Sequence, residues 1–360
     1  MEKPKTLVAM SGGVDSSVAA ALLLEQGHDI IGVTLKTFCY SEFPGGPKSC
    51  CGLEGVMDAK MVSNKLGIQH MVYDVTKTFE KEVIDDFIKE YSAGRTPNPC
   101  VRCNATVKIP DLLKRAKTLG CTFVATGHYA RIKKLDENFL MYRGIDRDKD
   151  QSYFLWEIPK FVLPNLLFPL GNLTKSEVRA HARRFGLDNA EKPESQEVCF
   201  IPQKNYFDFL QTCLPKNHSG FSSGALLTVD RKVIGTHKGF LRYTVGQRKG
   251  LGGGHGKKLY VIKIEPLTRE VTVGEEKDLY FNKIEVAQTN VLVPSFPFGE
   301  IIGVQIRHRF QPVLARLERC DLDRWLITFE TPAKAATPGQ SAAVFLENLL
   351  LGGGKIESAS

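Results

Sequence analysis

Short apolar runs alternate with longer amphipathic stretches over the first 130 residues. The apolar runs predict buried strands over residues 6–10, 29–36, 69–75 and 121–130. The amphipathic stretches predict helices over residues 16–27, 57–67, 80–94 and 106–120. Regular alternation of strand and helix is typical of a parallel sheet covered on both faces. We therefore predict a doubly wound α/β domain, in which ligands bind at the carboxyl ends of the strands.

The pattern changes near residue 200. From about residue 206 the segments are short and are interrupted by Gly and Pro. After about residue 280, alternating positions predict strands over 284–293, 301–310, 313–320, 324–330 and 341–354. Their spacing is typical of a small β-barrel or sandwich. Because 360 residues exceed one typical core, we predict an α/β domain over 1–205, a small mixed or β central domain over 206–280, and a β-barrel over 281–360.

The composition is that of a soluble globular protein, with 42% hydrophobic and 24% charged residues. The sequence contains no run of the roughly 18 apolar residues that a membrane span requires. The opening segment also lacks the apolar core of a signal peptide. We therefore expect a cytoplasmic protein with no membrane partner.

The formal net charge is +8, and part of it is concentrated in the central region. Residues 231–258 contain no acid and eight basic residues: Arg231, Lys232, Lys238, Arg242, Arg248, Lys249, Lys257 and Lys258. A short basic run is as often simply a solvated surface. Here it alternates with Gly, Tyr and Phe in a basic protein, which favours a polyanion partner such as RNA.

A glycine- and serine-rich loop, SGGVDSS, occupies residues 11–17 between the first predicted strand and helix. The backbone amides of such a loop and the following helix terminus favour a phosphate group. An ordinary turn with a serine cap is the simpler explanation for two glycines and a serine alone. The loop lacks the Gly-Lys-Ser/Thr of a Walker A motif and also differs from the dinucleotide-binding GxGxxG pattern.

Nine cysteines in a cytoplasmic chain indicate catalysis or metal binding before a disulfide scaffold. Cys100 and Cys103 form a C-x-x-C pair, and Pro97 and Pro99 predict that this pair lies in a loop. Arg102 beside the pair is expected to lower the thiol pKa, which favours the nucleophilic thiolate. A structural zinc site is an alternative, with Cys50 and Cys51 supplying a second pair of ligands.

Cys199 follows a polar segment where the α/β pattern ends. A lone cysteine is usually an inert, small hydrophobic residue. Together with the phosphate-type loop and the C-x-x-C pair, however, Cys199 becomes a candidate for the reactive partner. We expect structural roles for Cys39, Cys121, Cys213 and Cys320.

Eight motifs, in order along the chain, carry a resemblance to a known family: MSGGVDSSVAA, GRTPNPCVRCN, ATGHYAR, DKDQSYFL, ESQEVCFI, YTVGQRKGLG, RHRFQP and TPGQSA. The sequence resembles the bacterial tRNA-specific 2-thiouridylases, which place sulfur on uridine 34 of the anticodon. This family belongs to the PP-loop ATP pyrophosphatases, which split ATP into AMP and pyrophosphate. The resemblance implies a PP-loop domain, a central tRNA-binding domain and a C-terminal β-barrel.

The resemblance also implies an ATP site around the glycine-rich loop. Its residues would be Ala9, Met10, Ser11, Gly12, Gly13, Val14, Asp15, Ser16 and Ser17. Asp15 would help to organise Mg²⁺. Leu35 would lie against the adenine, and Gly127 would allow the backbone to approach the nucleotide.

The implied reaction begins when ATP adenylates O2 of the uracil and pyrophosphate leaves. A persulfide carried by Cys199 then attacks C2, and AMP leaves. Cys103 attacks as the partner nucleophile, and a transient Cys103–Cys199 disulfide forms before a reductant resets it. The family implies sulfur delivery by a persulfide-carrying relay protein or a cysteine desulfurase, and tRNA substrates for Lys, Glu and Gln.

Cys100 departs from one form of the family pattern, because many relatives have Asp at this position. A thiol supplies no carboxylate charge at neutral pH unless its pKa is lowered. An alternative is that Cys100, Cys103 and Cys199 ligate three irons of a [4Fe–4S] cluster, leaving the fourth iron to bind sulfide.

The resemblance places Asn98, Pro99 and Cys100 against the flipped target base. Further contacts to the base, nucleotide or tRNA are implied for His128, Lys149, Asp150, Gln151, Arg307, His308, Arg309 and Gln340. Simpler explanations are a hydrogen-bonded histidine at a strand end, a charged surface turn at 149–151 and a type II turn at 337–340.

Two other functions fit part of the sequence. Another AMP-forming PP-loop enzyme, such as an amide-forming ligase, would explain residues 11–17 but not the cysteines or the basic region. A non-catalytic RNA-binding protein would explain the basic region, but it has no need of an intact Asp15 and its serines.

Overall fold

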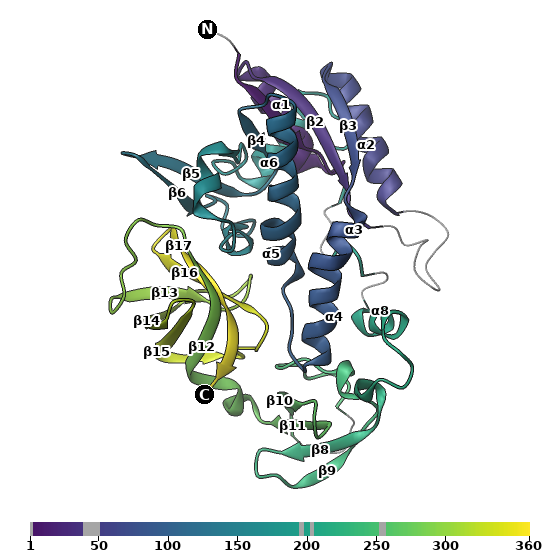
Figure 1. Cartoon of the computed structure of the whole chain (residues 1–360), viewed down its shortest axis with the longest axis vertical. Coiled ribbons are helices and arrows are strands. Elements are labelled where there is room, and N and C mark those ends of the chain that lie inside the picture. Colours follow the sequence, from purple (N-terminus) through teal and green to yellow (C-terminus); the bar gives the residue numbers. More distant parts are fainter. Residues whose placement is uncertain (1–2, 39–50, 194–197, 202–204, 252–256) are drawn as a thin grey trace.

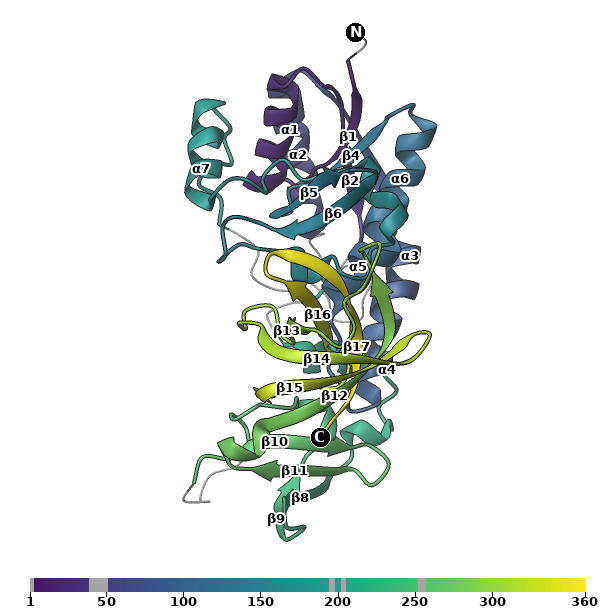
Figure 2. The same ribbon diagram turned by 90° about the vertical axis from the view of Figure 1, so that its left-hand side faces the viewer.

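The protein forms an elongated arrangement of three parts, with the N-terminal α/β unit at one end and a small β-sheet at the other (Figures 1 and 2). The computed structural model describes residues 3–38, 51–193, 198–201, 205–251 and 257–360. For residues 51–53 it describes the backbone but not the side chains. A β-barrel lies beside the helices that connect the two ends. Among the helices so described, none is long and apolar enough to cross a membrane.

The N-terminal sheet has five strands in the order β3-β2-β1-β4-β7. Its strands are β1 (Lys5–Ala9), β2 (Asp29–Lys36), β3 (Gln69–Asp74), β4 (Phe123–Ala125) and β7 (Leu166–Leu167). Every pairing in this sheet is parallel, which confirms the predicted fold class. The apolar centres of β1 and β2 are buried, as strands covered on both faces require.

The helices of this unit follow the predicted order but differ in length. They are α1 (Val14–Glu25), α2 (Cys51–Leu66), α3 (Thr76–Phe79), α4 (Asp85–Ser92), α5 (Pro99–Cys103), α6 (Ile109–Thr118) and α7 (Lys175–Arg184). One π-helical turn, Glu80–Ile84, joins α3 to α4, and another, Asn104–Lys108, joins α5 to α6. Gly27, with φ of +86°, follows α1 as a helix-terminating glycine should.

The prediction that Pro97 and Pro99 place the cysteine pair in a loop is wrong. Pro99 is the first residue of α5, and the Asn98 side chain accepts a hydrogen bond from the Val101 amide at 3.4 Å. Proline suits this first position because its missing N–H would lack a helical partner anyway. Cys100 and Cys103 therefore lie on a helix that continues through the π turn into α6.

Two β-sheets make up the rest of the chain, together with α8 (Tyr206–Cys213). The central sheet has the order β10-β11-β8-β9 and comprises β8 (Gly224–Thr228), β9 (Val233–His237), β10 (Tyr260–Glu265) and β11 (Glu270–Gly274). The C-terminal strands are β12 (Tyr280–Val291), β13 (Ile301–Gln305), β14 (Val313–Asp321), β15 (Arg324–Lys334), β16 (Ser341–Leu346) and β17 (Leu349–Ala359). Pairing of β12 with β17 closes these six strands into a barrel, as predicted.

A hairpin from the N-terminal part extends the barrel's sheet. The predicted strand over 121–130 ends early, and the chain continues into β5 (Ala130–Leu135) and β6 (Asn138–Arg143). Tyr142 of β6 pairs with Leu349 of β17. The expected domain boundaries near 205 and 280 stay a prediction.

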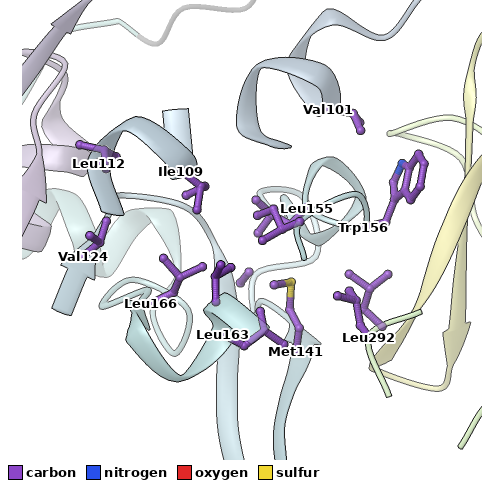
Figure 3. Packing of buried hydrophobic residues seen from close by; sticks show 14 of the residues in the cluster. Val101, Ile109, Leu112, Val124, Met141, Leu155, Trp156, Leu163, Leu166 and Leu292 are labelled. Carbon is purple, nitrogen blue, oxygen red and sulfur yellow. The ribbon is translucent and has the colours of Figure 1, made fainter. Parts of the chain in front are cut away.

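A shared hydrophobic core joins the α/β unit to the barrel. Val101 of α5, Trp156 and Leu292 belong to the same buried cluster as Leu112 and Val124. Figure 3 shows these side chains running from the helix beside the sheet to the edge of the barrel. Because separating the parts would expose this apolar surface to water, the core fixes the barrel against the helix that carries the cysteine pair.

Candidate active site

A cavity of about 850 Å³ lies between the α/β unit and the barrel. Of the residues predicted to bind ATP, the base or tRNA, those that line it are Ser11, Gly12, Gly13, Val14, Asp15, Asn98, Pro99, Cys100, Lys149, Gln151, His308, Arg309 and Gln340. They come from segments separated by up to 329 positions in the sequence, between Ser11 and Gln340. The volume lies within the range usual for ligand pockets.

The glycine-rich loop is tightly held at one end of the cavity. Gly12 has φ of +79°, and a Cβ there would lie 2.4 Å from the Gly55 carbonyl oxygen. The Ser16 and Ser17 hydroxyls donate to the Gly13 carbonyl at 3.1 and 3.0 Å. Among the described residues no side chain caps α1 at Gly13. The first turn of α1 is therefore suited to an anion such as a phosphate.

Asp15 connects this loop to two residues that the sequence analysis missed. Its Oδ1 accepts hydrogen bonds from the Tyr129 hydroxyl at 2.8 Å and from the Lys175 ammonium at 2.7 Å. Tyr129 follows the predicted Gly127–His128 segment, and Lys175 is the first residue of α7. The fold brings these donors to the loop from distant segments. Tyr129 lies in the ATGHYAR motif, but the motif alone does not show that its hydroxyl reaches Asp15.

Two further residues shape this end of the cavity. Gly127 packs closely against the start of α1, and Lys192 lines the cavity itself. A Cβ at Gly127 would lie 2.8 Å from the Ser16 amide nitrogen, so a side chain there would displace the start of α1. Lys192, also missed from the sequence, lines the cavity and forms ion pairs with Glu54 and Asp58. The Asn189 side chain donates to the Gly12 carbonyl at 3.0 Å.

The three candidate cysteines are neighbours. Cys100 is exposed and lines the cavity, Cys103 is buried one helical turn further on, and Cys199 is exposed. Phe200 anchors the Cys199 turn because its fully buried ring contacts Phe79 and Phe87, with centroid separations of 5.7 and 5.2 Å. The thiols of Cys100 and Cys103 each interact electrostatically with that of Cys199, and the interaction with Cys103 is the larger.

The surroundings of these thiols favour their protonated forms. Burial raises the pKa of Cys199 to about 12 and that of Cys100 to about 11, and it also raises the pKa of Cys103. Cys100 and Cys199 keep solvent-accessible atoms, but the protein packed around each sulfur removes most of its water, and this desolvation disfavours the thiolate.

The expectation that Arg102 lowers the thiol pKa is wrong. Its guanidinium is engaged by Glu82 and Glu157, at 3.2 and 2.9 Å. The cation that lowers the pKa of all three thiols is Lys108, at the end of the π turn. The π turn brings Lys108 to the face of Cys103, five residues earlier, which a regular helical period does not predict.

Substituting Lys108 by Met is expected to raise the thiol pKa values further. The loss of the positive charge removes a stabilising interaction from each thiolate. The thiolate fraction then falls at any given pH below the pKa. Alkylation of Cys100 and Cys199 by iodoacetamide, followed against pH, should shift to higher pH in Lys108→Met. Lys114→Met, on the exposed part of α6, is the control, and a shift of equal size there would contradict the assignment.

His128 interacts with Lys108 but is not among the described residues that line the cavity. It shares a hydrogen bond of 2.7 Å with the Thr126 hydroxyl, and burial, followed by Lys108, lowers its pKa to about 3. The imidazole is therefore neutral at physiological pH. It can accept or donate a hydrogen bond there, but it supplies no positive charge.

The C-terminal part of the chain also contributes to the lining of the cavity. His308 lies 4.4 Å from Phe154, centroid to centroid, and hydrogen-bonds the Asp150 carbonyl at 3.1 Å. Gln340 donates to the carbonyls of Thr96 and Pro97 at 3.1 and 3.0 Å. Gln340 thus fixes the segment that leads into α5, in addition to lining the cavity.

Some predicted residues do not line the cavity in the described part of the chain: Ala9, Met10, Ser16, Ser17, Leu35, Cys103, Gly127, His128, Asp150, Cys199 and Arg307. Asp150 is buried, and its carboxylate accepts bonds from Arg143 at 2.7 Å and from Ser152 at 2.8 Å. Arg307 donates to the Val245 carbonyl and the Thr337 hydroxyl. Both therefore hold neighbouring segments together.

The same geometry bears on metal binding. Within the described ranges, no three Cys, His, Asp or Glu side chains are arranged to hold a metal ion. The arrangement gives no support to the [4Fe–4S] alternative. Cys50 and the Cys51 side chain, invoked for zinc, lie outside the described residues, as does Cys39. A Mg²⁺ site needs fewer protein ligands, because Mg²⁺ is usually bound by one or two carboxylates and by substrate phosphates. Asp15 supplies such a carboxylate.

A glycine- and serine-rich loop at the start of the first helix, which lines one cavity together with the Cys100 thiol, is typical of a PP-loop nucleotide-binding fold. The models that match describe a tRNA methyl transferase HUP domain over residues 4–203, a tRNA methyl transferase PRC-barrel domain over 208–275 and an aminomethyltransferase beta-barrel domain over 282–356. With the relatives described next, these matches identify the particular family: the chain belongs to the tRNA-specific 2-thiouridylases.

The curated relatives are similar over almost the whole chain. The tRNA-specific 2-thiouridylase MnmA of Carboxydothermus hydrogenoformans is 42% identical over 99% of this chain and 98% of its own. That of Rickettsia felis is 42% identical over 99% of this chain and 97% of its own. The solved U34-tRNA thiolase NcsA from Methanococcus maripaludis, with its [4Fe-4S] cluster, covers 55% of this chain and 62% of its own at 18% identity, with a TM-score of 0.36.

Proposed function

We propose that this protein catalyses ATP-dependent 2-thiolation of uridine 34 in the tRNA anticodon. The observation that carries the proposal is a single cavity that combines the phosphate-type loop at Ser11–Asp15 with the Cys100 thiol. Cys103 and Cys199 lie beside that thiol. Methyl transfer, which the domain descriptions mention, needs neither a phosphate-binding loop nor a group of thiols.

The first step activates the uracil. Its O2 attacks the α-phosphorus of ATP, an O2–phosphorus bond forms, and the bond to pyrophosphate breaks. The amides at the start of α1 hold the departing pyrophosphate, and the Lys175 and Lys192 ammonium groups lie at the same end of the cavity. Asp15 would hold Mg²⁺, which would supply positive charge to the leaving pyrophosphate.

The second step transfers sulfur. Cys199 carries a persulfide, whose terminal sulfur attacks C2 of the adenylated uracil, and AMP leaves with the former O2. The Cys103 thiolate then attacks the Cys199 sulfur, and the bond between that sulfur and the transferred sulfur breaks. 2-Thiouridine is released and a Cys103–Cys199 disulfide remains. Lys108 stabilises the thiolate that attacks.

The lining of the cavity suits a flipped base. Asn98, Pro99 and Cys100 line it together with His308 and Phe154, whose rings lie 4.4 Å apart, centroid to centroid. Base–aromatic stacking is a common way to hold an unstacked nucleotide. We expect Lys149, Gln151 and Arg309, which also line the cavity, to contact the anticodon.

The remaining partners follow from the family. We expect tRNAs for Lys, Glu and Gln as substrates, and a persulfide relay protein or cysteine desulfurase as the sulfur donor. Since tRNA and these donors are cytoplasmic, we place the protein in the cytoplasm.

Formation of AMP and pyrophosphate from ATP should require tRNA. A tRNA anticodon that contains uridine 34 should stimulate it, and the same RNA with cytidine 34 should not. Stimulation by a small carboxylic acid instead would favour the amide-forming ligase. Absence of ATP cleavage with tRNA and a persulfide donor present would favour a non-catalytic RNA-binding protein.

Replacing Arg248 and Lys249 together by Gln is expected to weaken tRNA binding about tenfold at physiological salt. Both are exposed residues of the basic central region. Each phosphate contact removed should reduce the slope of log affinity against log salt by about 0.7–0.9, so the loss of both should reduce it by about 1.4–1.8. Fluorescence anisotropy over a salt series measures both quantities. Lys114→Gln with Lys117→Gln changes the charge equally on α6, and an effect of the same size there would refute the assignment.

A further inference from the structure

Cys100 has no part in the two steps above, although it is the thiol that opens directly onto the cavity. Cys103 is buried, and Cys199 lies on a separate turn held by Phe200. The three thiols form a group in which Cys103 interacts with both others. This order, from an exposed thiol through a buried one to a second exposed thiol, suits disulfide exchange.

The helix fixes the spacing between Cys100 and Cys103. They are three residues apart within α5, which begins at Pro99 and is capped by Asn98. In an α-helix, Cα atoms three residues apart are separated by about 5 Å. Disulfides form across Cα separations of about 4.4–6.8 Å. The pair can therefore be oxidised with little movement of the backbone.

We propose that Cys100 is the resolving thiol that releases Cys199 after sulfur transfer, an inference that rests on the proposed function. The Cys100 thiolate attacks the Cys103 sulfur of the Cys103–Cys199 disulfide. A Cys100–Cys103 bond forms and the Cys103–Cys199 bond breaks. Cys199 leaves as a thiolate and takes up the proton that Cys100 lost, so the exchange involves no net oxidation or reduction.

An external dithiol then supplies the two electrons and two protons that reduce the Cys100–Cys103 disulfide. Cys100 gives this dithiol an accessible sulfur to attack, whereas Cys103 is buried. The Cys199 thiol can accept the next sulfur atom, and so become a persulfide again, before that reduction is complete. The Lys108 charge stabilises the thiolate that forms at each position.

The test uses the full-length protein and its Cys100→Ser variant, with Cys121→Ser as the control outside the thiol group. Each is incubated with a persulfide donor, ATP and tRNA without dithiol, trapped with N-ethylmaleimide and mapped by peptide mass spectrometry. The wild type and Cys121→Ser should contain a Cys100–Cys103 disulfide and alkylated Cys199. Cys100→Ser should retain Cys103–Cys199. In a parallel reaction that contains an external dithiol, Cys100→Ser should also lose multiple turnover by about tenfold or more. Predominance of Cys103–Cys199 in the wild type would overturn the proposal.

A second arm separates this inference from the proposed function. The proteins are oxidised with diamide in the absence of tRNA and ATP, and the disulfides are mapped in the same way. Cys100–Cys103 should predominate in the wild type, whether or not thiolation is observed. A predominant Cys103–Cys199 bond would overturn the inference, while failure to form 2-thiouridine would overturn only the proposed function. Cys100→Ala serves as the second variant if Cys100→Ser is poorly folded.

Discussion

Cys199→Ser is expected to abolish 2-thiouridine formation, with a loss of at least about 10³-fold, while ATP binding stays within about twofold. A serine hydroxyl cannot carry a persulfide, so the sulfur that attacks C2 is absent. Cys103→Ser should cause a comparable loss, because the thiolate that releases the transferred sulfur is missing. Neither residue lines the described part of the phosphate end of the cavity, where ATP is expected to bind.

Nucleoside mass spectrometry measures the thiolation, and a fluorescent ATP analogue measures nucleotide binding. Cys320→Ser is the matched control, because Cys320 is an exposed cysteine on β14. Full thiolation by Cys199→Ser or Cys103→Ser would rule out the assigned roles. Loss of ATP binding in either variant would show that the substitution disturbs the fold of the site.

Asp15→Asn is expected to slow AMP formation by on the order of 10²-fold. The amide retains an oxygen for the Tyr129 hydroxyl, but it loses the charge that pairs with Lys175. The substitution also removes the carboxylate that would hold Mg²⁺. The rate of tRNA-dependent AMP release at saturating ATP measures the effect.

The control for Asp15 is Asp111→Asn, which removes a carboxylate from the Arg115 ion pair on α6, away from the cavity. That variant should retain the wild-type rate. If Asp15→Asn releases AMP as fast as Asp111→Asn, the phosphate site does not involve Asp15. Partial recovery of Asp15→Asn at raised Mg²⁺ concentration would support its part in holding the cation.

The hydrophobic pattern predicted the parallel sheet and the barrel because both depend on local periodicity. The strand over 29–36 matches β2 residue for residue. The hairpin of β5 and β6 was missed, because it follows the short strand β4 directly and pairs with a strand more than 200 residues later. Local periodicity contains no information on such pairing.

The cysteine helix shows why local rules failed at the site. Proline usually breaks a helix, but Pro99 begins α5, and the first position of a helix tolerates proline. Likewise, Arg102 is the obvious cation in the sequence, yet two carboxylates engage it. The π turn instead brings Lys108 to the thiols.

Residues that act from distant segments were also missed. Tyr129, Lys175 and Lys192 reach the phosphate end of the cavity only through the fold. The predicted site residues within the eight motifs were found because the family resemblance brought them together before their geometry was known. Tyr129 was missed although it lies in ATGHYAR, because the motif does not show that its hydroxyl reaches Asp15.

The most direct measurement is mass spectrometry of nucleosides from tRNA incubated with the protein, ATP and a persulfide donor. The account predicts 2-thiouridine at position 34, formed only when ATP is present and in proportion to the AMP released. ATP cleavage without 2-thiouridine, or 2-thiouridine formed equally well without ATP, would contradict it.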